Sequence, residues 1–291
     1  MPEQNQRRIV VTGGNKGIGL ATVERILAEH SDTFVYLGSR NEERGATAVR
    51  QLMTSHPEWA GRVALLGLDV SRDESVLSAS STVEAPLYGI VNNAGIGGRR
   101  ASLEDVLQVN AYGPWRVCEA FAPLLRQRGR VVIVTSAAGP NFVQRCSDEM
   151  QQFFLSDSLT WKALDELMRE CVALRAPEDF EARGLGDGDS YGLSKACANA
   201  AMKILARKHP ELVVNACTPG FVATDMTQSY VSERGKTAAE LGLKTPFEGA
   251  TATLHLLFGE FETSGWYFGS DAQRSPLNRY RSPGDPPYAG D

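Results

Sequence analysis

The chain has 291 residues and a formal net charge of −5. This acidic balance disfavours nucleic acid or an anionic membrane surface as the main partner. No apolar run approaches the length of a membrane span, and the first eight residues lack the apolar core of a signal peptide, so we expect a cytoplasmic protein.

The five cysteines point to neither a disulfide framework nor a metal site. They are odd in number, scattered, and without C-x-x-C spacing: Cys118, Cys146, Cys171, Cys197 and Cys217. Such residues are typical of buried or free thiols in a reducing compartment.

The first predicted elements form a strand, a glycine loop and a helix. Residues 8–12 are mostly β-branched, and an amphipathic helix is expected through about Glu29. Between them, Gly13, Gly17 and Gly19 give the spacing Gly-x-x-x-Gly-x-Gly. This context is what a dinucleotide fingerprint requires, because glycines allow backbone N–H groups to approach a pyrophosphate at a helix start. The predicted cofactor contacts of this loop are Gly13, Asn15, Lys16, Gly17, Ile18 and Gly19.

The end of the second predicted strand, residues 33–38, indicates which nicotinamide cofactor binds. An acidic residue there would accept the ribose 2′-hydroxyl of NAD, whereas an arginine accommodates the 2′-phosphate of NADP. This chain has Arg40 there and no acid until Glu42, and Lys16 could reach the same phosphate. We therefore predict NADP. The open alternative is that Arg40 is an ordinary solvated residue at the end of a strand.

Strands and helices alternate along the rest of the chain. Further strands are expected at residues 62–68, 87–92, 130–135, 212–216 and 266–268, and helices at 103–125, 142–174, 191–208 and 246–258, with a loop at 181–190. Alternation of this kind predicts an α/β, doubly wound parallel sheet with helices on both faces. We expect one Rossmann domain over residues 1–275, with a helical insertion at about 140–185, and an extended or disordered Pro/Gly-rich tail over 276–291.

Tyr191 and Lys195 are the leading candidates for acid–base chemistry. On a helix, residues i and i+4 share a face, so a lysine ammonium lies beside the phenol. A phenol titrates near ~10 in water, and a fixed positive charge lowers that pKa toward neutrality. Such a pair is common on amphipathic helices and by itself is a weak sign of catalysis. Here the glycine loop in the same chain strengthens the catalytic interpretation.

Taken together, the motifs resemble those of the short-chain dehydrogenase/reductase family. They follow the family's order: Thr12 to Gly19, Asp69-Val70, Asn92 to Gly95, Asn110, Ser136, Tyr191 to Lys195, and Pro219-Gly220. The loop Thr12-Gly13-Gly14-Asn15-Lys16-Gly17-Ile18-Gly19 looks most like that of the NADP-dependent carbonyl reductase branch.

The resemblance implies a reductase with a four-residue catalytic site. Tyr191 would donate a proton to the carbonyl oxygen, Lys195 would lower the pKa of the phenol and contact the nicotinamide ribose, and Ser136 would hydrogen-bond the carbonyl oxygen. Asn110 is similar to the residue that holds a proton-relaying water, and the open alternative is a polar residue that satisfies helix backbone groups. The remaining cofactor contacts that the family implies are Asp69, Val70, Asn92, Ala94, Gly95, Pro219, Gly220, Val222 and Thr224.

The spacing between Ser136 and Tyr191 is long, and carbonyl reductases carry a comparable helical insertion. In that branch the insertion is associated with monomers, so the resemblance implies a monomer. Two departures limit what carries over about substrates. Cys217-Thr218 stands where relatives often have two adjacent cysteines, and the loop at 184–189 lacks their aromatic and proline.

The substrate itself stays open. The expected reaction is NADPH-dependent reduction of a ketone, aldehyde or quinone to an alcohol. The alternatives are reduction of an activated C=C bond and, in a different class, a non-catalytic NADP-sensing protein. Candidate pocket walls, each of which could equally be core, are Phe142, Trp161, Phe221, Met226 and Tyr230.

Overall fold

One eight-stranded sheet lies at the centre of the protein. The computed structural model describes residues 6–97, 101–260 and 263–290. The strands are β1 (Arg7–Val11), β2 (Thr33–Ser39), β3 (Val63–Gly67), β4 (Leu87–Asn92), β5 (Leu125–Val134), β6 (Val213–Cys217), β7 (Tyr267–Phe268) and β8 (Arg274–Ser275). Their order is β3-β2-β1-β4-β5-β6-β7-β8, and all neighbours are parallel except β7 and β8. The chain winds outward from β1 in both directions, which confirms the predicted single-domain, doubly wound α/β fold.

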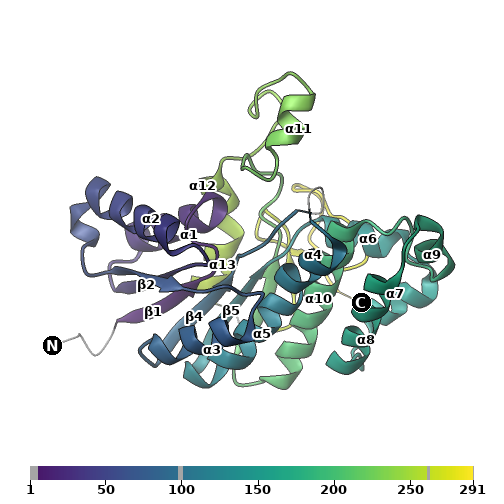
Figure 1. Ribbon diagram of the computed structural model, residues 1–291, viewed down its shortest axis with the longest axis horizontal. Coiled ribbons are helices and arrows are strands. Elements are labelled where there is room, and N and C mark those ends of the chain that lie inside the picture. The colour runs from purple at the N-terminus through teal and green to yellow at the C-terminus, as the bar shows by residue number, and fades with distance from the viewer. Residues whose placement is uncertain (1–5, 98–100, 261–262, 291) are drawn as a thin grey trace.

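Helices cover both faces of the sheet (Figure 1). The longer helices are α1 (Gly17–Glu29), α2 (Glu42–Ser55), α3 (Asp73–Thr82), α4 (Leu103–Asn110), α5 (Tyr112–Phe121), α6 (Ala138–Arg145), α7 (Asp148–Leu155), α8 (Trp161–Ala173), α10 (Ser190–Lys208) and α13 (Thr251–Phe258). Shorter ones are η1 (Pro57–Trp59), η2 (Ala122–Leu124), α9 (Pro177–Ala182), α11 (Gln228–Glu233) and α12 (Pro246–Gly249). Helices α1, α2 and α13 pack on one face, and α3, α5 and α10 on the other. Within the described ranges, none is long and apolar enough to cross a membrane.

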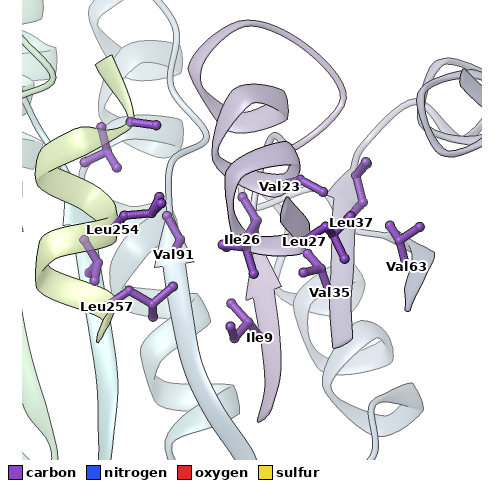
Figure 2. Close-up of a cluster of buried hydrophobic side chains, with 14 of the residues drawn as sticks. Ile9, Val23, Ile26, Leu27, Val35, Leu37, Val63, Val91, Leu254 and Leu257 are labelled. Atoms are coloured by element: carbon purple, nitrogen blue, oxygen red, sulfur yellow. The ribbon is translucent and has the colours of Figure 1, made fainter. Parts of the chain in front are cut away.

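The alternation of side chains along β1 explains why both faces need helices. Ile9 and Val11 point into the core beneath α1, whereas Val10 packs on the opposite face with residues of α3 and α5. Figure 2 shows the first cluster, in which Ile26 of α1 and Leu257 of α13 meet Ile9 and its neighbours. Ile9, Val10 and Val11 are fully buried, and each contributes about 1.5–3 kcal/mol to folding. Packing on both faces therefore fixes the sheet whose carboxyl edge carries the motifs.

The predicted helix at 103–125 is two helices, α4 and α5, which meet at Ala111. Pro114 is the physical reason, because proline has no N–H to donate to the carbonyl of Asn110, four residues earlier, and its ring clashes with that carbonyl. Pro114 is tolerated in the first turn of α5, where N–H groups have no intrahelical partner anyway. The prediction of one continuous helix was wrong.

The predicted helical stretch at 142–174 is also divided, and it starts earlier, with α6 at Ala138. Ser147 accepts a hydrogen bond from the N–H of Met150 and begins α7, while Thr160 accepts from the N–H of Ala163 and begins α8. Such caps favour new helix starts over continuation. Helices α7, α8 and α9 project beside α6 and α10 at one side of the molecule (Figure 1).

The C-terminal segment contains no helix or strand after Ser275 among its described residues, but it is held by a buried arginine. The guanidinium of Arg281 contacts both carboxylate oxygens of Asp271 at 2.5 Å and donates to the Ser275 hydroxyl and the Asp285 carbonyl. The residue is 8% exposed. These contacts tie the segment to the turn between β7 and β8.

Candidate active site

A cleft of about 650 Å³ opens at the carboxyl edge of the sheet. This is where open α/β folds bind ligands, because the strand order reverses there between β1 and β4. Fifteen of the predicted site residues line it: Gly13, Asn15, Lys16, Gly17, Ile18, Gly19, Arg40, Asp69, Val70, Ala94, Gly95, Tyr191, Lys195, Pro219 and Thr224. The described lining does not include Asn92, Asn110, Ser136, Gly220 or Val222.

The glycine loop has a backbone that requires glycine at three positions. Gly13 has φ +64° and Gly17 has φ +56°, both in the left-handed region that other residues avoid. A Cβ on Gly19 would lie 2.3 Å from the carbonyl oxygen of Gly13, so a side chain cannot fit there. Among the described contacts no side chain caps the start of α1, and no acid lies in its first turn. Its first N–H groups therefore face the cleft, as a pyrophosphate site requires.

Asn93, which was not among the predicted cofactor contacts, braces this loop. Its side-chain nitrogen donates to the carbonyls of Thr12 (3.0 Å) and Gly13 (3.2 Å). The Thr12 hydroxyl in turn accepts from the backbone N–H groups of Asn93 (3.0 Å) and Ala94 (2.9 Å). The preceding residue, Asn92, is 2% exposed and points toward Cys118, with 3.6 Å between its nitrogen and the sulfur. Bracing of the loop thus belongs to Asn93.

Two cations stand at the rim of the cleft near the end of β2. Arg40 is exposed. Lys16 is also exposed, and its ammonium lies 2.7 Å from the carboxylate of Asp225, in the segment that follows β6. This ion pair lowers the pKa of Asp225. The pair joins the glycine loop to the opposite wall of the cleft, a contact that spacing in the sequence could not indicate.

Asp69 and Val70 follow β3 and form another part of the wall. One carboxylate oxygen of Asp69 accepts from the N–H and the hydroxyl of Ser71, at 3.0 and 2.7 Å. Val70 packs against Gly113 at the start of α5, where a Cβ would meet the valine at 3.0 Å. The turn after β3 is therefore rigid.

Tyr191 and Lys195 lie on the first turns of α10, as the i, i+4 spacing predicts. Asp189 accepts a hydrogen bond from the N–H of Tyr191 at 3.2 Å and so caps the helix. The ammonium nitrogen of Lys195 lies 5.6 Å from the centre of the Tyr191 ring and donates to the carbonyl of Val134 at 3.1 Å. Both side chains face the cleft beside the end of β5.

The electrostatics of this pair differ from the simple expectation. Burial raises the pKa of Tyr191, and the Ser136 hydroxyl, which interacts with the phenol, opposes that rise. Burial lowers the pKa of Lys195 to about 8. Desolvation disfavours the charged form of each group, so both are drawn toward neutrality. The expected lowering of the Tyr191 pKa by Lys195 is not met, and the lowering influence comes from Ser136.

The other two predicted catalytic residues are Ser136 and Asn110. Ser136 lies just after β5, and its hydroxyl accepts a hydrogen bond from the N–H of Ala138 at 3.2 Å. Asn110 is 1% exposed, and its side chain exchanges two 2.9 Å hydrogen bonds with the backbone of Ile96. Its amide also donates to the Ser194 hydroxyl at 3.0 Å. The side chain of Asn110 thus satisfies backbone groups of the loop after β4.

The segment after β6 supplies the wall opposite the glycine loop. Pro219 and Thr224 line the cleft, and Gly220 has φ +85° and packs against Ser270. Val222 is buried and pairs with Lys244 in an isolated parallel bridge. The two ends of the segment 223–243 therefore lie side by side. This excursion, with α11, projects above the sheet in Figure 1. It also brings Asp225, Met226 and Gln228 to the cleft.

The five candidate pocket walls lie in three different environments. Phe142 is 1% exposed in the core between α6 and α10, and Trp161 stacks on Trp115 with ring centres 3.8 Å apart. Met226 lines the cleft, whereas Phe221 is exposed and packs edge-on against Tyr230 at 4.8 Å. Phe142 and Trp161 therefore serve as core.

Known proteins with similar sequences identify the family of this chain. Residues 7–147 match the family model described as short chain dehydrogenase. The protein called carbonyl reductase (NADPH) 3 from Rattus norvegicus is 33% identical over 258 residues, covering 82% of this chain and 89% of that protein. A protein named (+)-neomenthol dehydrogenase from Arabidopsis thaliana is 32% identical, covering 92% of this chain and 97% of its own length.

A solved structure agrees with these relatives. Salutaridine reductase from Papaver somniferum superposes with a TM-score of 0.75 at 25% identity, covering 90% of this chain and 99% of that one. Family members are oxidoreductases that bind nicotinamide cofactors, and the cleft described above has the parts that such a cofactor requires. The chain belongs to the short-chain dehydrogenase/reductase family and is carbonyl reductase-like.

Proposed function

We propose that the protein is an NADPH-dependent reductase that converts a small-molecule carbonyl, a ketone, aldehyde or quinone, to an alcohol. The observation that carries this proposal is the meeting of Tyr191 and Lys195 with the glycine loop in one cleft. These groups come from α10 and from the β1–α1 turn, which are far apart in the sequence. The cleft volume of about 650 Å³ lies within the ~300–1,000 Å³ usual for cofactor sites.

The residues at the inner end of the cleft take the acid–base roles. When bound, NADPH supplies the hydride. Tyr191 donates the proton to the carbonyl oxygen, and its raised pKa keeps the phenol protonated until that step. Ser136, in contact with the phenol, donates a hydrogen bond to the same oxygen, and Lys195 contributes positive charge nearby.

Asn110 supports a proton path by its backbone. Pro114 has no N–H, so it cannot make the helical hydrogen bond to the Asn110 carbonyl. A carbonyl released in this way is able to accept from a water beside Lys195. The Asn110 side chain lies in the same region as Lys195, because a Cβ on Gly95 would lie 3.3 Å from the Asn110 side-chain oxygen and 3.5 Å from the Lys195 nitrogen.

The preference for NADP is supported by charge at the rim of the cleft. Arg40 stands where an acid would serve NAD, and Lys16 lies on the adjoining loop. Guanidinium and ammonium groups both favour a 2′-phosphate. The names of the rat and other mammalian carbonyl reductases, which specify NADPH, point the same way.

Three further expectations from the sequence stay proposals. We propose a monomer because α7–α9 cover the outer side of α5 and α10, and light scattering at the mass of 31.6 kDa would check it. A cytoplasmic location is the second. The third is the division into a domain over residues 1–275 and a tail over 276–291.

The test is loss of NADPH absorbance with a panel of quinones, aromatic aldehydes, ketones and enones, with NADH as the cofactor control. Tyr191→Phe should lower kcat by about 10²–10⁴-fold while the Kd for NADPH stays close to wild type. Product analysis separates an alcohol from a saturated ketone, the product of C=C reduction. Tight NADPH binding without turnover of any panel member would favour the cofactor-sensing alternative, and a Tyr191→Phe variant with near wild-type kcat would refute the role of Tyr191.

A further inference from the structure

Thr218 lies immediately beneath the floor of the cleft, between β6 and Pro219. It is 3% exposed. Its backbone N–H donates to the Phe268 carbonyl of β7 at 3.0 Å, which fixes the residue at the carboxyl edge of the sheet. The described residues that line the cleft include its neighbours Thr135 and Pro219 but not Thr218 itself. Any influence of Thr218 on the site therefore acts through other groups.

The hydroxyl of Thr218 joins two segments of the active site. Its oxygen accepts the backbone N–H of Ala137 at 3.2 Å and the backbone N–H of Gly220 at 3.2 Å. Ala137 directly follows Ser136, and Gly220 belongs to the segment opposite the glycine loop. One buried oxygen atom thus connects the segment that carries Ser136 with the segment expected to meet the nicotinamide.

The N–H of Ala137 has particular need of this acceptor. Ala137 precedes the first residue of α6, and its own side chain cannot cap the helix. N–H groups at a helix start have no intrahelical acceptor, and leaving one buried and unpaired costs about 1–3 kcal/mol. The next N–H, of Ala138, donates to the Ser136 hydroxyl at 3.2 Å. Two consecutive N–H groups are thus satisfied by two hydroxyls, of which Ser136 faces Tyr191.

Tyr267 of β7 lies near Thr218. It is 3% exposed, and among the described residues its phenol oxygen has no hydrogen-bond partner. The Thr218 hydroxyl is therefore fixed by the two N–H groups that it accepts, those of Ala137 and Gly220. A fixed acceptor of this kind holds backbone positions more tightly than a mobile surface group would.

We propose that Thr218 is a positioning residue that holds the Ser136 hydroxyl against Tyr191 and sets the Gly220 backbone by accepting both N–H groups. This inference rests on the proposed reductase function for its catalytic consequence. The hydrogen bonds themselves are testable without any substrate.

The experiment compares Thr218→Val, which keeps the shape and removes the acceptor, with Thr218→Ser, which keeps the acceptor. We expect Thr218→Val to lower kcat, normalised to the number of sites that bind NADPH, by about 10- to 100-fold. A group that stabilises the transition state loses much of its effect when it shifts by a fraction of an ångström. Thr218→Ser should stay within about threefold of wild type, since its hydroxyl replaces the same acceptor.

Two readouts separate positioning from general loss of stability. Because the Ser136 contact opposes the rise in the pKa of Tyr191, its loss in Thr218→Val should move the Tyr191-dependent limb of the kcat profile to higher pH. Amide hydrogen exchange at Ala137 and Gly220 should accelerate in Thr218→Val and return to the wild-type rate in Thr218→Ser. If Thr218→Val does not fold, Thr218→Cys, with a weak sulfur acceptor, should show the same changes in smaller degree.

Unchanged exchange at Ala137 and Gly220 in Thr218→Val would overturn the proposal. Equal loss of kcat in Thr218→Val and Thr218→Ser would also overturn it, because the variant that keeps the acceptor would then be no better than the variant that lacks it. Failure of the reductase function looks different. Wild type would then reduce no panel member, while the exchange at these two amides would still respond to loss of the Thr218 hydroxyl.

Discussion

At the residue scale, the charge next to β2 is the basis of the proposed preference for NADPH. Arg40 is exposed at the rim of the cleft and occupies the position in which an acidic residue would serve NAD. A carboxylate there would repel the 2′-phosphate of NADPH and could accept from the ribose hydroxyl of NADH. The proposed preference for NADPH therefore rests on Arg40 and on Lys16 of the glycine loop.

We predict that Arg40→Asp raises the Kd for NADPH by about 10- to 100-fold, the equivalent of one charge-assisted hydrogen bond, and improves NADH relative to NADPH. Fluorescence titration of both cofactors measures the two Kd values. Arg50→Asp is the matched control, because Arg50 is also exposed but lies farther along α2, away from the residues that line the cleft. Equal effects of Arg40→Asp on both cofactors would contradict the assignment.

Lys195 provides a second prediction at this scale, concerning pH. Burial lowers its pKa from 10.5 to about 8, so the unfolded chain binds a proton more readily than the native one between these values. Stability of the unliganded protein should therefore rise with pH across that window, by up to about 3 kcal/mol, because the cost of the buried charge is relieved.

The variant Lys195→Met has no ammonium group to bury. Its free energy of unfolding should exceed that of wild type by the largest amount below pH ~8, and this difference should shrink toward pH ~10. Urea unfolding at the two pH values measures the difference. Lys162→Met serves as control, since 86% of the Lys162 side chain is exposed. A difference between wild type and Lys195→Met that does not change with pH would rule out this linkage.

At the element scale, the helical insertion is attached to the body by aromatic packing. Trp161 of α8 stacks on Trp115 of α5 with an interplanar angle of 5°, and the Tyr112 ring meets Trp161 edge-on at 5.7 Å. The Tyr112 hydroxyl donates to the Asp165 carboxylate at 2.7 Å. The insertion therefore shares one hydrophobic cluster with α4, α5 and α10, and its residues are not among the described residues that line the cleft.

We expect Trp161→Ala to lower the free energy of unfolding by about 2–4 kcal/mol, through loss of the stacked ring and the space that it leaves. The Kd for NADPH should change little, because Trp161 does not line the described cleft. Leu77→Ala is the control, as Leu77 is 62% exposed. A large rise in the Kd for NADPH with unchanged stability would instead place Trp161 at the cofactor site.

At the scale of the whole molecule, a largely buried ion pair helps to join the C-terminal segment to the sheet. The Arg281 side chain is 6% exposed and its Asp271 partner 23% exposed. Arg281→Met leaves the carboxylate without its partner and should cost on the order of 3 kcal/mol of stability. Thermal and urea unfolding test this, with the exposed Arg279→Met as control, which should change stability by less than about 0.5 kcal/mol.

The interaction with Arg281 lowers the pKa of the Asp271 carboxyl against the opposing effect of its partial burial. The ion pair therefore stabilises the folded state fully above the ordinary carboxyl pKa of ~3.9, and this stabilisation is lost as pH falls below that value. The difference between Arg281→Met and wild type should accordingly shrink in strong acid. A difference that persists there would point to lost packing of the arginine stem.

The sequence alone determined the parts of the protein whose chemistry depends on near neighbours in the chain. The glycine loop, the Tyr191–Lys195 spacing and the alternation of strands predicted the fold and the family, and both are confirmed. Pro114 even carried the signal that divides α4 from α5, since proline lacks the N–H that a continuous helix needs.

Only the tertiary structure decided which of two adjacent residues braces the loop and which distant groups meet. Successive residues near a strand end point to opposite sides, so Asn93 rather than Asn92 supports the glycine loop. The Lys16–Asp225 ion pair and the Thr218 hydroxyl that links Ala137 to Gly220 join segments about 80 to 200 residues apart. Such contacts depend on how strands are ordered in the sheet, which local spacing does not encode.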